Sequence, residues 1–275
     1  MLIYNYDQLK QFFLKSQKDK IIGIDTEFYR VSTYYPKLCL IQISNKNSTI
    51  IIDPLCKKID FSLIKKIFFN RNIIKVFHAA YQDIEILFNL FGKIPENIVD
   101  IQLCLSEIGF SESLGYADAC KNLLDIKIDK KNQFIDWRKR PLEKEKILYA
   151  INDVKYLPKL FLKISEKINI AENINIIRSH KKLLNEETYK KKPKNAWKKL
   201  KIVEIKNYEI KKLKKVCFIR EELAKEKDIP VKKIMTDQNV KLLCKKKVNK
   251  KDKKLILESV EFTNFKKELS KILVN

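Results

Sequence analysis

The sequence predicts an α/β fold in which a mixed β-sheet is flanked by helices, followed by a small all-α helical domain. In the first two thirds of the 275 residues, short β-rich apolar runs alternate with helical patterns, as expected of a mixed sheet covered by helices. Only amphipathic helical patterns follow. We therefore expect an α/β domain over residues 1–170, a basic linker over 171–204 and a helical domain over 205–275.

The α/β region opens with three β-rich runs separated by short polar turns, which predict a three-stranded meander. Their sequences are IIGIDTEF at 21–28, KLCLIQIS at 37–44 and STIIIDPL at 48–55. The elements expected after them are a helix at 62–69, a strand at 73–79, a helix at 83–91, a strand at 98–103, a helix at 113–124 and a longer helix from about 143 that Pro158 kinks or ends. The last third predicts amphipathic helices within 210–230, 231–246 and 253–273.

The net charge of +24 is carried mostly by lysine, because only six of the 58 basic residues are arginine. Such enrichment is typical of AT-rich coding, so a solvated lysine-rich surface is one interpretation. The distribution favours another, since residues 171–275 hold 31 basic and 14 acidic side chains, whereas residues 1–170 hold 27 and 20. A basic field concentrated in one region is expected of a module that holds a polyanion such as nucleic acid.

The sequence also bears on the cellular compartment. No apolar run reaches the roughly 18 residues that a membrane-spanning helix needs, and the opening MLIYNYDQLKQFF lacks the order of a signal peptide. The six cysteines are widely spaced without a CxxC pair, which indicates reduced thiols rather than a zinc site. We therefore expect a cytoplasmic protein with no membrane partner and no obligate protein partner.

Acidic residues stand at spacings that suit a shared site. Alternation along a strand sends Asp25 and Glu27 to one face, so both carboxylates can hold one metal ion while Thr26 points into the core. Tyr149 and Asp153 are four residues apart on a predicted helix and therefore share one of its faces. There Asp153 could complete a metal shell, and the phenol could orient or help deprotonate an attacking water.

Each of these motifs has a simpler interpretation when it is considered alone. A D-x-E sequence is common, Tyr149 could pack against the core beside a solvated Asp153, and Asp83 could serve the dipole at the start of its helix. The order of the whole set favours a shared site, because each acid stands at the end of a sheet element or on a covering helix. Four carboxylates at one point suit two divalent cations at a phosphodiester.

The order D-x-E, D, Y-x-x-x-D resembles the DEDD 3′-5′ exonuclease superfamily in its tyrosine subclass, and most closely the ribonuclease D family. IDTEF, HAAYQDIEIL and YAINDVKYL are similar to the family's three motifs. The intervening segments VDIQL, SLGYADACKNLL and QFIDWRKRPL are similar to family segments in the same order. The resemblance covers about residues 1–170 and implies a ribonuclease H-like exonuclease domain there.

Carried over to this chain, the resemblance implies five catalytic residues and two divalent metal ions, Mg²⁺ or Mn²⁺. The catalytic residues would be Asp25, Glu27, Asp83, Tyr149 and Asp153. The first ion would be bound by Asp25, Glu27 and Asp153, and Asp83 would hold the second partly through water. Residues expected to bind substrate are Phe28, Tyr29, His78, Gln102, Arg138 and Arg140. Core packing stays an alternative for Phe28 and His78.

The basic tail resembles, in part, the helicase-and-RNase-D C-terminal domain. The similar segments are NAWKKLK and KKLKKVCFIREELAKEKDIPVKKIMTD, although Phe218 stands where that family usually has tryptophan. We therefore expect a metal-dependent 3′-5′ exoribonuclease that releases nucleoside 5′-monophosphates and trims tRNA precursors and other structured RNAs. One alternative is a 3′-5′ DNA exonuclease, and a second is a non-catalytic nucleic-acid-binding protein, which the presence of all five site residues disfavours.

Overall fold

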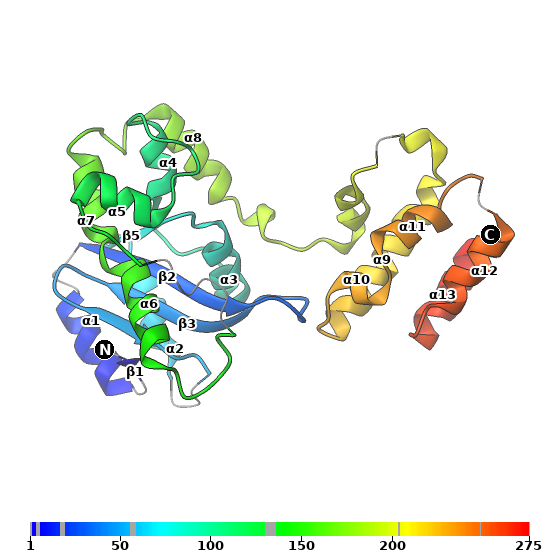
Figure 1. The fold of residues 1–275 in the computed structure, drawn as a ribbon, viewed down its shortest axis with the longest axis horizontal. Helices are drawn as coiled ribbons and strands as arrows, with labels where there is room; N and C mark the ends of the chain where they lie inside the picture. Colours follow the sequence, from blue (N-terminus) through cyan, green and yellow to red (C-terminus); the bar gives the residue numbers. More distant parts are fainter. Residues whose placement is uncertain are drawn as a thin grey trace. The chain divides into compact units, whose positions relative to one another are not determined.

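The computed structural model describes residues 2–3, 6–16, 20–55, 59–129, 136–202, 204–247 and 249–274. The chain divides into two compact units, which are shown in Figure 1. Unit 1 comprises Met1–Tyr29 and Lys37–Tyr189, and unit 2 comprises Arg30–Pro36 and Lys190–Asn275. Unit 1 is a mixed sheet with flanking helices and unit 2 is helical, which confirms the predicted fold class.

Unit 1 is built on a six-stranded sheet with the strand order β1-β4-β3-β2-β5-β6. The strands are β1 (Leu2–Ile3), β2 (Ile21–Tyr29), β3 (Lys37–Ser44), β4 (Thr49–Ile52), β5 (Ile74–Phe77) and β6 (Ile98–Asp100). Antiparallel pairing of β2 with β3 and of β3 with β4 confirms the predicted meander. β5 runs parallel to β2, and β6 runs parallel to β5, so the sheet is mixed.

Helices cover both faces of this sheet (Figure 1). On one face the apolar sides of α1 (Tyr6–Ser16), α2 (Phe61–Phe68) and α3 (Tyr81–Phe91) pack against alternate strand residues that include Ile22 and Ile24. The helices that pack with the other face are α4 (Ile101–Ser106), α5 (Tyr116–Leu124), α6 (Lys144–Lys155), α7 (Leu157–Ser165) and α8 (Ile174–Leu183). Because neighbouring strand residues alternate, Asp25 and Glu27 face the side that carries α6.

The end of α6 and the start of α7 are held closely against β2. A Cβ atom at Gly23 would lie 3.0 Å from the Val154 carbonyl oxygen of α6 and 2.7 Å from Leu157 Cβ of α7, so only glycine permits this approach. The Ser44 hydroxyl donates a hydrogen bond of 2.7 Å to the Val154 carbonyl oxygen. The expected long helix is two helices here, since α7 begins at Leu157 with Pro158 in its first turn, where proline is tolerated.

Some predicted boundaries were wrong, and side-chain caps explain them. The strand expected at 98–103 ends at Asp100, because its carboxylate accepts the Gln102 N–H at 3.0 Å and starts α4. The helix expected at 231–246 is divided, because the Thr236 hydroxyl caps α11 by accepting from Asn239. Within the range expected as a basic linker, Asn173 caps α8.

Unit 2 is a helical bundle with its own apolar core. Its principal elements are the 3₁₀ helix η2 (Pro193–Leu200) and the α-helices α9 (Ile210–Glu226), α10 (Val231–Ile234), α11 (Asp237–Leu243), α12 (Lys250–Glu258) and α13 (Thr263–Val274). The long helix α9 contributes Leu213 and Val216, both fully buried, to this core. None of the helices in the described residues has the length and apolar character required to cross a bilayer.

The segment 30–36, which connects β2 to β3 along the chain, belongs to the core of unit 2. Tyr34 is 6% exposed, and its hydroxyl donates to the buried carboxylate of Glu221 at 2.9 Å. Its backbone N–H donates to Asp228 at 3.0 Å. The Lys191 ammonium donates to the Tyr34 carbonyl oxygen and lies 4.0 Å from the centroid of the Tyr34 ring. A segment that leaves the central strand therefore stabilises the helical unit.

We expect Tyr34→Phe to destabilise the protein by about 1–3 kcal/mol, because the substitution leaves the buried Glu221 carboxylate with one hydrogen bond fewer. The control is Tyr35→Phe, since no described residue is hydrogen-bonded to the Tyr35 hydroxyl. Urea denaturation followed by circular dichroism measures the difference. Equal midpoints for the two variants would contradict the role of the Tyr34 hydroxyl.

Candidate functional site

The candidate site forms where β5 leaves the sheet. β5 pairs with β2 as far as Gly23 and Val76, so no strand of the described residues covers that edge of β2 beyond Gly23. Asp25 and Glu27 lie on this open stretch. An open pocket lies against it, with about 1080 Å³ of empty volume that includes solvent at its mouth. The end of β5 therefore leaves room beside two acidic side chains.

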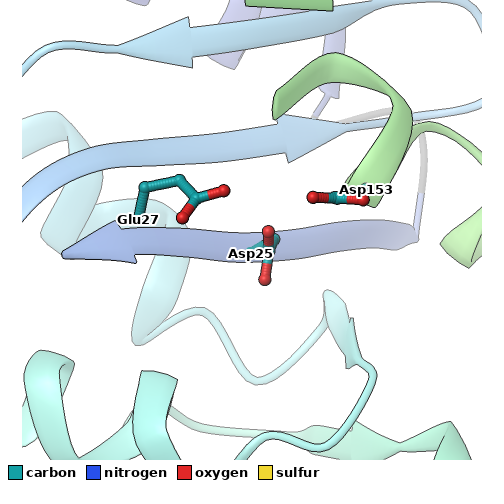
Figure 2. Close-up of side chains that lie close together, drawn as sticks. All are labelled: Asp25, Glu27 and Asp153. Carbon is teal, nitrogen blue, oxygen red and sulfur yellow. The ribbon is translucent and has the colours of Figure 1, made fainter. Parts of the chain in front are cut away.

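Three carboxylates come together in this pocket. Asp25, Glu27 and Asp153 each offer one oxygen within 4.8 Å of the others. Figure 2 shows Asp153 reaching from α6 toward the carboxylates of Asp25 and Glu27 on β2. Strand alternation places the first two on one face, and the close packing of α6 on that face brings the third. The group has the composition of an all-oxygen metal site.

The fourth predicted carboxylate, Asp83, lines the same pocket from the first turn of α3. Thr26 points to the opposite side of β2 from its neighbours, and its hydroxyl donates to Asp83 at 2.5 Å. Thr26 and Asp83 are 4% and 6% exposed, so this hydrogen bond is buried. The sequence prediction placed Thr26 only in the core, because a threonine within a strand carries no signal about a partner 57 residues away.

Burial and mutual repulsion make the ionised carboxylates unfavourable. Burial raises the pKa of Asp25 well above its usual range, and the neighbouring charges of Asp83, Glu27 and Asp153 add to the effect. The pKa of Glu27 is raised well above its usual range by the same two causes. Burial raises the pKa of Asp83 to about 7 and that of Asp153 to about 6. Bound cations would offset these costs.

Tyr149 lies one helical turn before Asp153 on α6, and both residues line the pocket. Burial and the nearby charge of Asp153 raise the pKa of Tyr149 further above its usual value. The phenol therefore keeps its proton at neutral pH and can donate a hydrogen bond but not act as a base. Its ring lies 6.1 Å from that of Trp137, which supports its position.

Two residues that were predicted to bind substrate, His78 and Gln102, form hydrogen bonds to the backbone beside the pocket. His78 lies in the pocket, and its Nε2 atom is hydrogen-bonded to the Leu114 carbonyl oxygen at 2.9 Å. Gln102 donates to the same oxygen at 3.1 Å. Burial lowers the pKa of His78, which favours the neutral ring. Both side chains thus fix Leu114 in the turn before α5. The next two residues, Gly115 and Tyr116, line the pocket.

The other predicted substrate residues differ in position. Phe28 lines the pocket, whereas Tyr29 packs with Arg138, whose guanidinium carbon is 3.4 Å from the Tyr29 ring centroid. Arg140 forms a bidentate ion pair with the buried Asp53, with N–O distances of 2.6 and 2.7 Å. This pairing gives Arg140 a structural role, and contact of these side chains with a substrate stays a prediction.

Comparison with known proteins links this arrangement to nucleases. Residues 1–169 match the model of a protein family described as 3′-5′ exonuclease. The chain is 34% identical over 241 residues to ribonuclease D of Sphingobium indicum, covering 87% of this chain and 62% of that protein. It is 36% identical over 218 residues to ribonuclease D of Bartonella henselae, covering 79% of this chain and 54% of that protein. The chain thus spans about 54–62% of the length of these curated relatives.

Solved structures share the fold. The crystal structure of Escherichia coli RNase D, described as an exoribonuclease involved in structured RNA processing, superposes with a TM-score of 0.83 at 23% identity, covering 100% of this chain and 73% of that one. The catalytic core of RRP6 from Trypanosoma brucei gives 0.71 at 21% identity, covering 99% and 78%. Brucella melitensis NrnC with bound Mg²⁺ gives 0.51 at 22% identity, covering 68% and 85%.

In the metal-free protein we expect stability to fall as pH rises. The folded-state pKa values of Asp83 and Asp153, about 7 and about 6, exceed the value of about 3.9 in an unfolded chain. The folded state therefore binds these protons more tightly, so the free energy of unfolding decreases between about pH 4 and about pH 7 and levels off above. Urea midpoints in EDTA measure this slope.

Asp83→Asn should flatten that pH dependence, because the substitution removes one of the titrating groups. Asp60→Asn is the control, since hydrogen bonds from Ser62 lower the pKa of the exposed Asp60 and so place its titration below the window. The same slope in the wild type and in Asp83→Asn would show that Asp83 does not contribute to the pH dependence of stability.

Proposed function

Because this chain belongs to the 3′-5′ exonuclease family, we propose that it is an exoribonuclease of the ribonuclease D type. It would release nucleoside 5′-monophosphates from the 3′ ends of tRNA precursors and other structured RNAs. The observation that carries the proposal is the close group of three carboxylates with Asp83 in the same pocket. The similar ribonucleases D support RNA as the polymer.

The proposed cofactors are two divalent cations, Mg²⁺ or Mn²⁺. Four carboxylates offer only oxygen ligands, which these hard cations prefer over the nitrogen and sulfur ligands typical of zinc. Asp25, Glu27 and Asp153 would hold one cation, and Asp83 with Asp25 would hold the other. The related fold of NrnC with bound Mg²⁺ supports this choice. The chemistry that such ions supply is activation of water and stabilisation of the departing 3′ oxygen.

The chain's own side chains would orient the reactants. The Tyr149 phenol is protonated and one turn from Asp153, so it can donate to an attacking water and hold its direction. Phe28 lines the pocket from the end of β2 and presents an aromatic surface for the terminal base. The turn held by His78 and Gln102 limits the pocket on another side.

We propose that residues 1–170 act as the exonuclease domain and residues 205–275 as the helical domain, joined through 171–204. We also propose a reducing compartment such as the cytoplasm, because the five described cysteines have free, buried thiols.

The decisive experiment uses two substrates labelled at the 5′ end, a 3′-extended tRNA and a single-stranded DNA, each with Mg²⁺ or with EDTA. We expect stepwise shortening of the RNA that EDTA abolishes, with nucleoside 5′-monophosphates as products. Degradation of DNA alone would favour the DNA exonuclease. Binding without degradation of either polymer would favour a non-catalytic nucleic-acid-binding protein.

Tyr149→Phe should lower turnover by about 10²–10⁴-fold while Mn²⁺ binding is preserved, because the phenol acts on water and not on the metal. Asp153→Asn should lose both activity and most Mn²⁺ binding. Isothermal titration with Mn²⁺ and single-turnover kinetics separate the two effects. Equal and small losses in the two variants would indicate that this face of α6 is structural.

The basic surface of unit 2 should contribute to RNA affinity. Its lysines include Lys211, Lys215 and Lys246, which line an open groove beside Tyr208. Replacing these three by Gln should weaken RNA binding and reduce the slope of log affinity against log salt by about 0.7–0.9 for each phosphate that the protein no longer neutralises. The control replaces three exposed lysines of unit 1, Lys66, Lys159 and Lys167. Equal slopes for both variants would favour a lysine-rich surface without a binding role.

A further inference from the structure

The turn that joins β5 to α3 contains a strained residue. Ala79 has a φ of 57°, in the left-handed region that residues with a Cβ atom avoid. The carboxylate of Asp100 spans this turn, because its two oxygens accept the N–H groups of Ala79 and Ala80, each at 2.9 Å. Ala79 lines the pocket of the carboxylates. The left-handed turn and the acidic pocket are therefore directly adjacent.

Asp100 is itself rigidly held. It is 4% exposed at the end of β6, and its carboxylate accepts a third N–H, that of Gln102, at 3.0 Å. Its own N–H donates to Nε2 of His180 at 2.8 Å, and the other ring nitrogen of His180 is hydrogen-bonded to the Ile176 carbonyl oxygen at 2.9 Å. An ionised carboxylate with three backbone donors forms stronger hydrogen bonds than a neutral acceptor.

The position of α3 depends on this turn. The helix begins at Tyr81, directly after the two residues that Asp100 holds, and Ile84 donates its N–H to the Ala80 carbonyl oxygen at 2.9 Å. Asp83 is the third residue of the helix. Its carboxylate faces β2 and accepts from Thr26. A rotation of the turn at Ala79 would therefore move Asp83 relative to Asp25.

We propose that Asp100 is a positioning residue for the metal centre: its carboxylate holds the Ala79–Ala80 turn in the left-handed conformation and thereby places Asp83 against the cluster on β2. The inference rests on the proposed function, because it assigns to Asp83 a part in cation binding. Asp100 acts only through the turn and is not a ligand.

The test is Asp100→Asn in the full chain, since asparagine keeps the shape of the side chain and is also a good helix cap. The one side-chain oxygen of asparagine cannot accept from all three N–H groups. Its amide NH₂ group would face a backbone N–H that needs an acceptor. We expect Mn²⁺ affinity, measured by isothermal titration, to fall about tenfold or more, as for other residues that orient metal ligands. The Mn²⁺ concentration that half-saturates turnover should rise by the same factor.

Asp60→Asn is the matched control, because Asp60 also caps a helix of unit 1 through its carboxylate, and within the described residues its hydrogen bonds come only from Ser62. It should leave Mn²⁺ affinity unchanged. The double variant Ala79→Gly, Asp100→Asn should bind Mn²⁺ about fivefold more tightly than Asp100→Asn, because glycine adopts a positive φ without the Cβ penalty.

Three outcomes would overturn the inference. One is an Asp100→Asn protein with a lower urea midpoint but the Mn²⁺ affinity of Asp60→Asn, since Asp100 would then be structural only. The second is a double variant that binds Mn²⁺ no better than Asp100→Asn. This result would show that Asp100 does not act on Mn²⁺ binding through the strained turn. The third is a wild-type chain that binds no Mn²⁺, and this result alone would also remove the proposed function.

Discussion

Mutual repulsion within a cluster of partly buried acidic side chains at one open edge of β2 is the main constraint on unit 1. Burial and mutual repulsion both disfavour the ionised state of this group, so the carboxylates stay together only because the surrounding elements hold them. Asp25 and Glu27 are held by the sheet, Asp153 by α6 and Asp83 by α3. Bound cations would offset the repulsion and favour the ionised carboxylates. The cluster is thus preorganised for metal at a cost to the metal-free fold.

Close packing and short strands make this arrangement possible. Gly23 allows α7 to approach β2, and Ser44 holds the carbonyl oxygen of Val154, the residue directly after Asp153. On the other side, β5 ends after four residues, which opens the pocket. A longer β5 would pair with β2 beside Asp25 and fill the space that the pocket now occupies. The site therefore results from where the elements end as much as from the side chains that they carry.

The helical unit is not simply appended at the C-terminus. Tyr34 lies between β2 and β3 in the sequence but is buried among the helices of unit 2, where Glu221, Asp228 and Lys191 are its partners. Removing residues 190–275 would expose Tyr34 and leave it without these partners. The basic field of the last third and the strand that carries Asp25 are thus joined through a segment of seven residues, 30–36.

Local patterns in the sequence predicted many of the strands and helices and the pairs of candidate site residues. The period of two along β2 and the period of 3.6 along α6 predicted that Asp25 shares a face with Glu27 and Tyr149 with Asp153, and the order of the acidic motifs favoured one shared site. The meander and the change from α/β to helical composition followed from the same kind of signal. The ends of helices and strands were less well predicted, as at Asp100. A helix cap depends on a single side chain, whereas the interior of an element shows a periodic pattern.

Only the tertiary structure decided which distant residues support the site. Thr26 meets Asp83 across 57 positions, Asp100 meets Ala79 across 21, and Tyr34 meets Glu221 across 187. Arg140 was expected from the sequence to bind substrate, yet its guanidinium donates hydrogen bonds to the carboxylate of Asp53, 87 positions away. Periodicity records which face of an element a residue occupies but not which other element packs there. Such pairs form only when burial forces each polar group to find a partner in the folded chain.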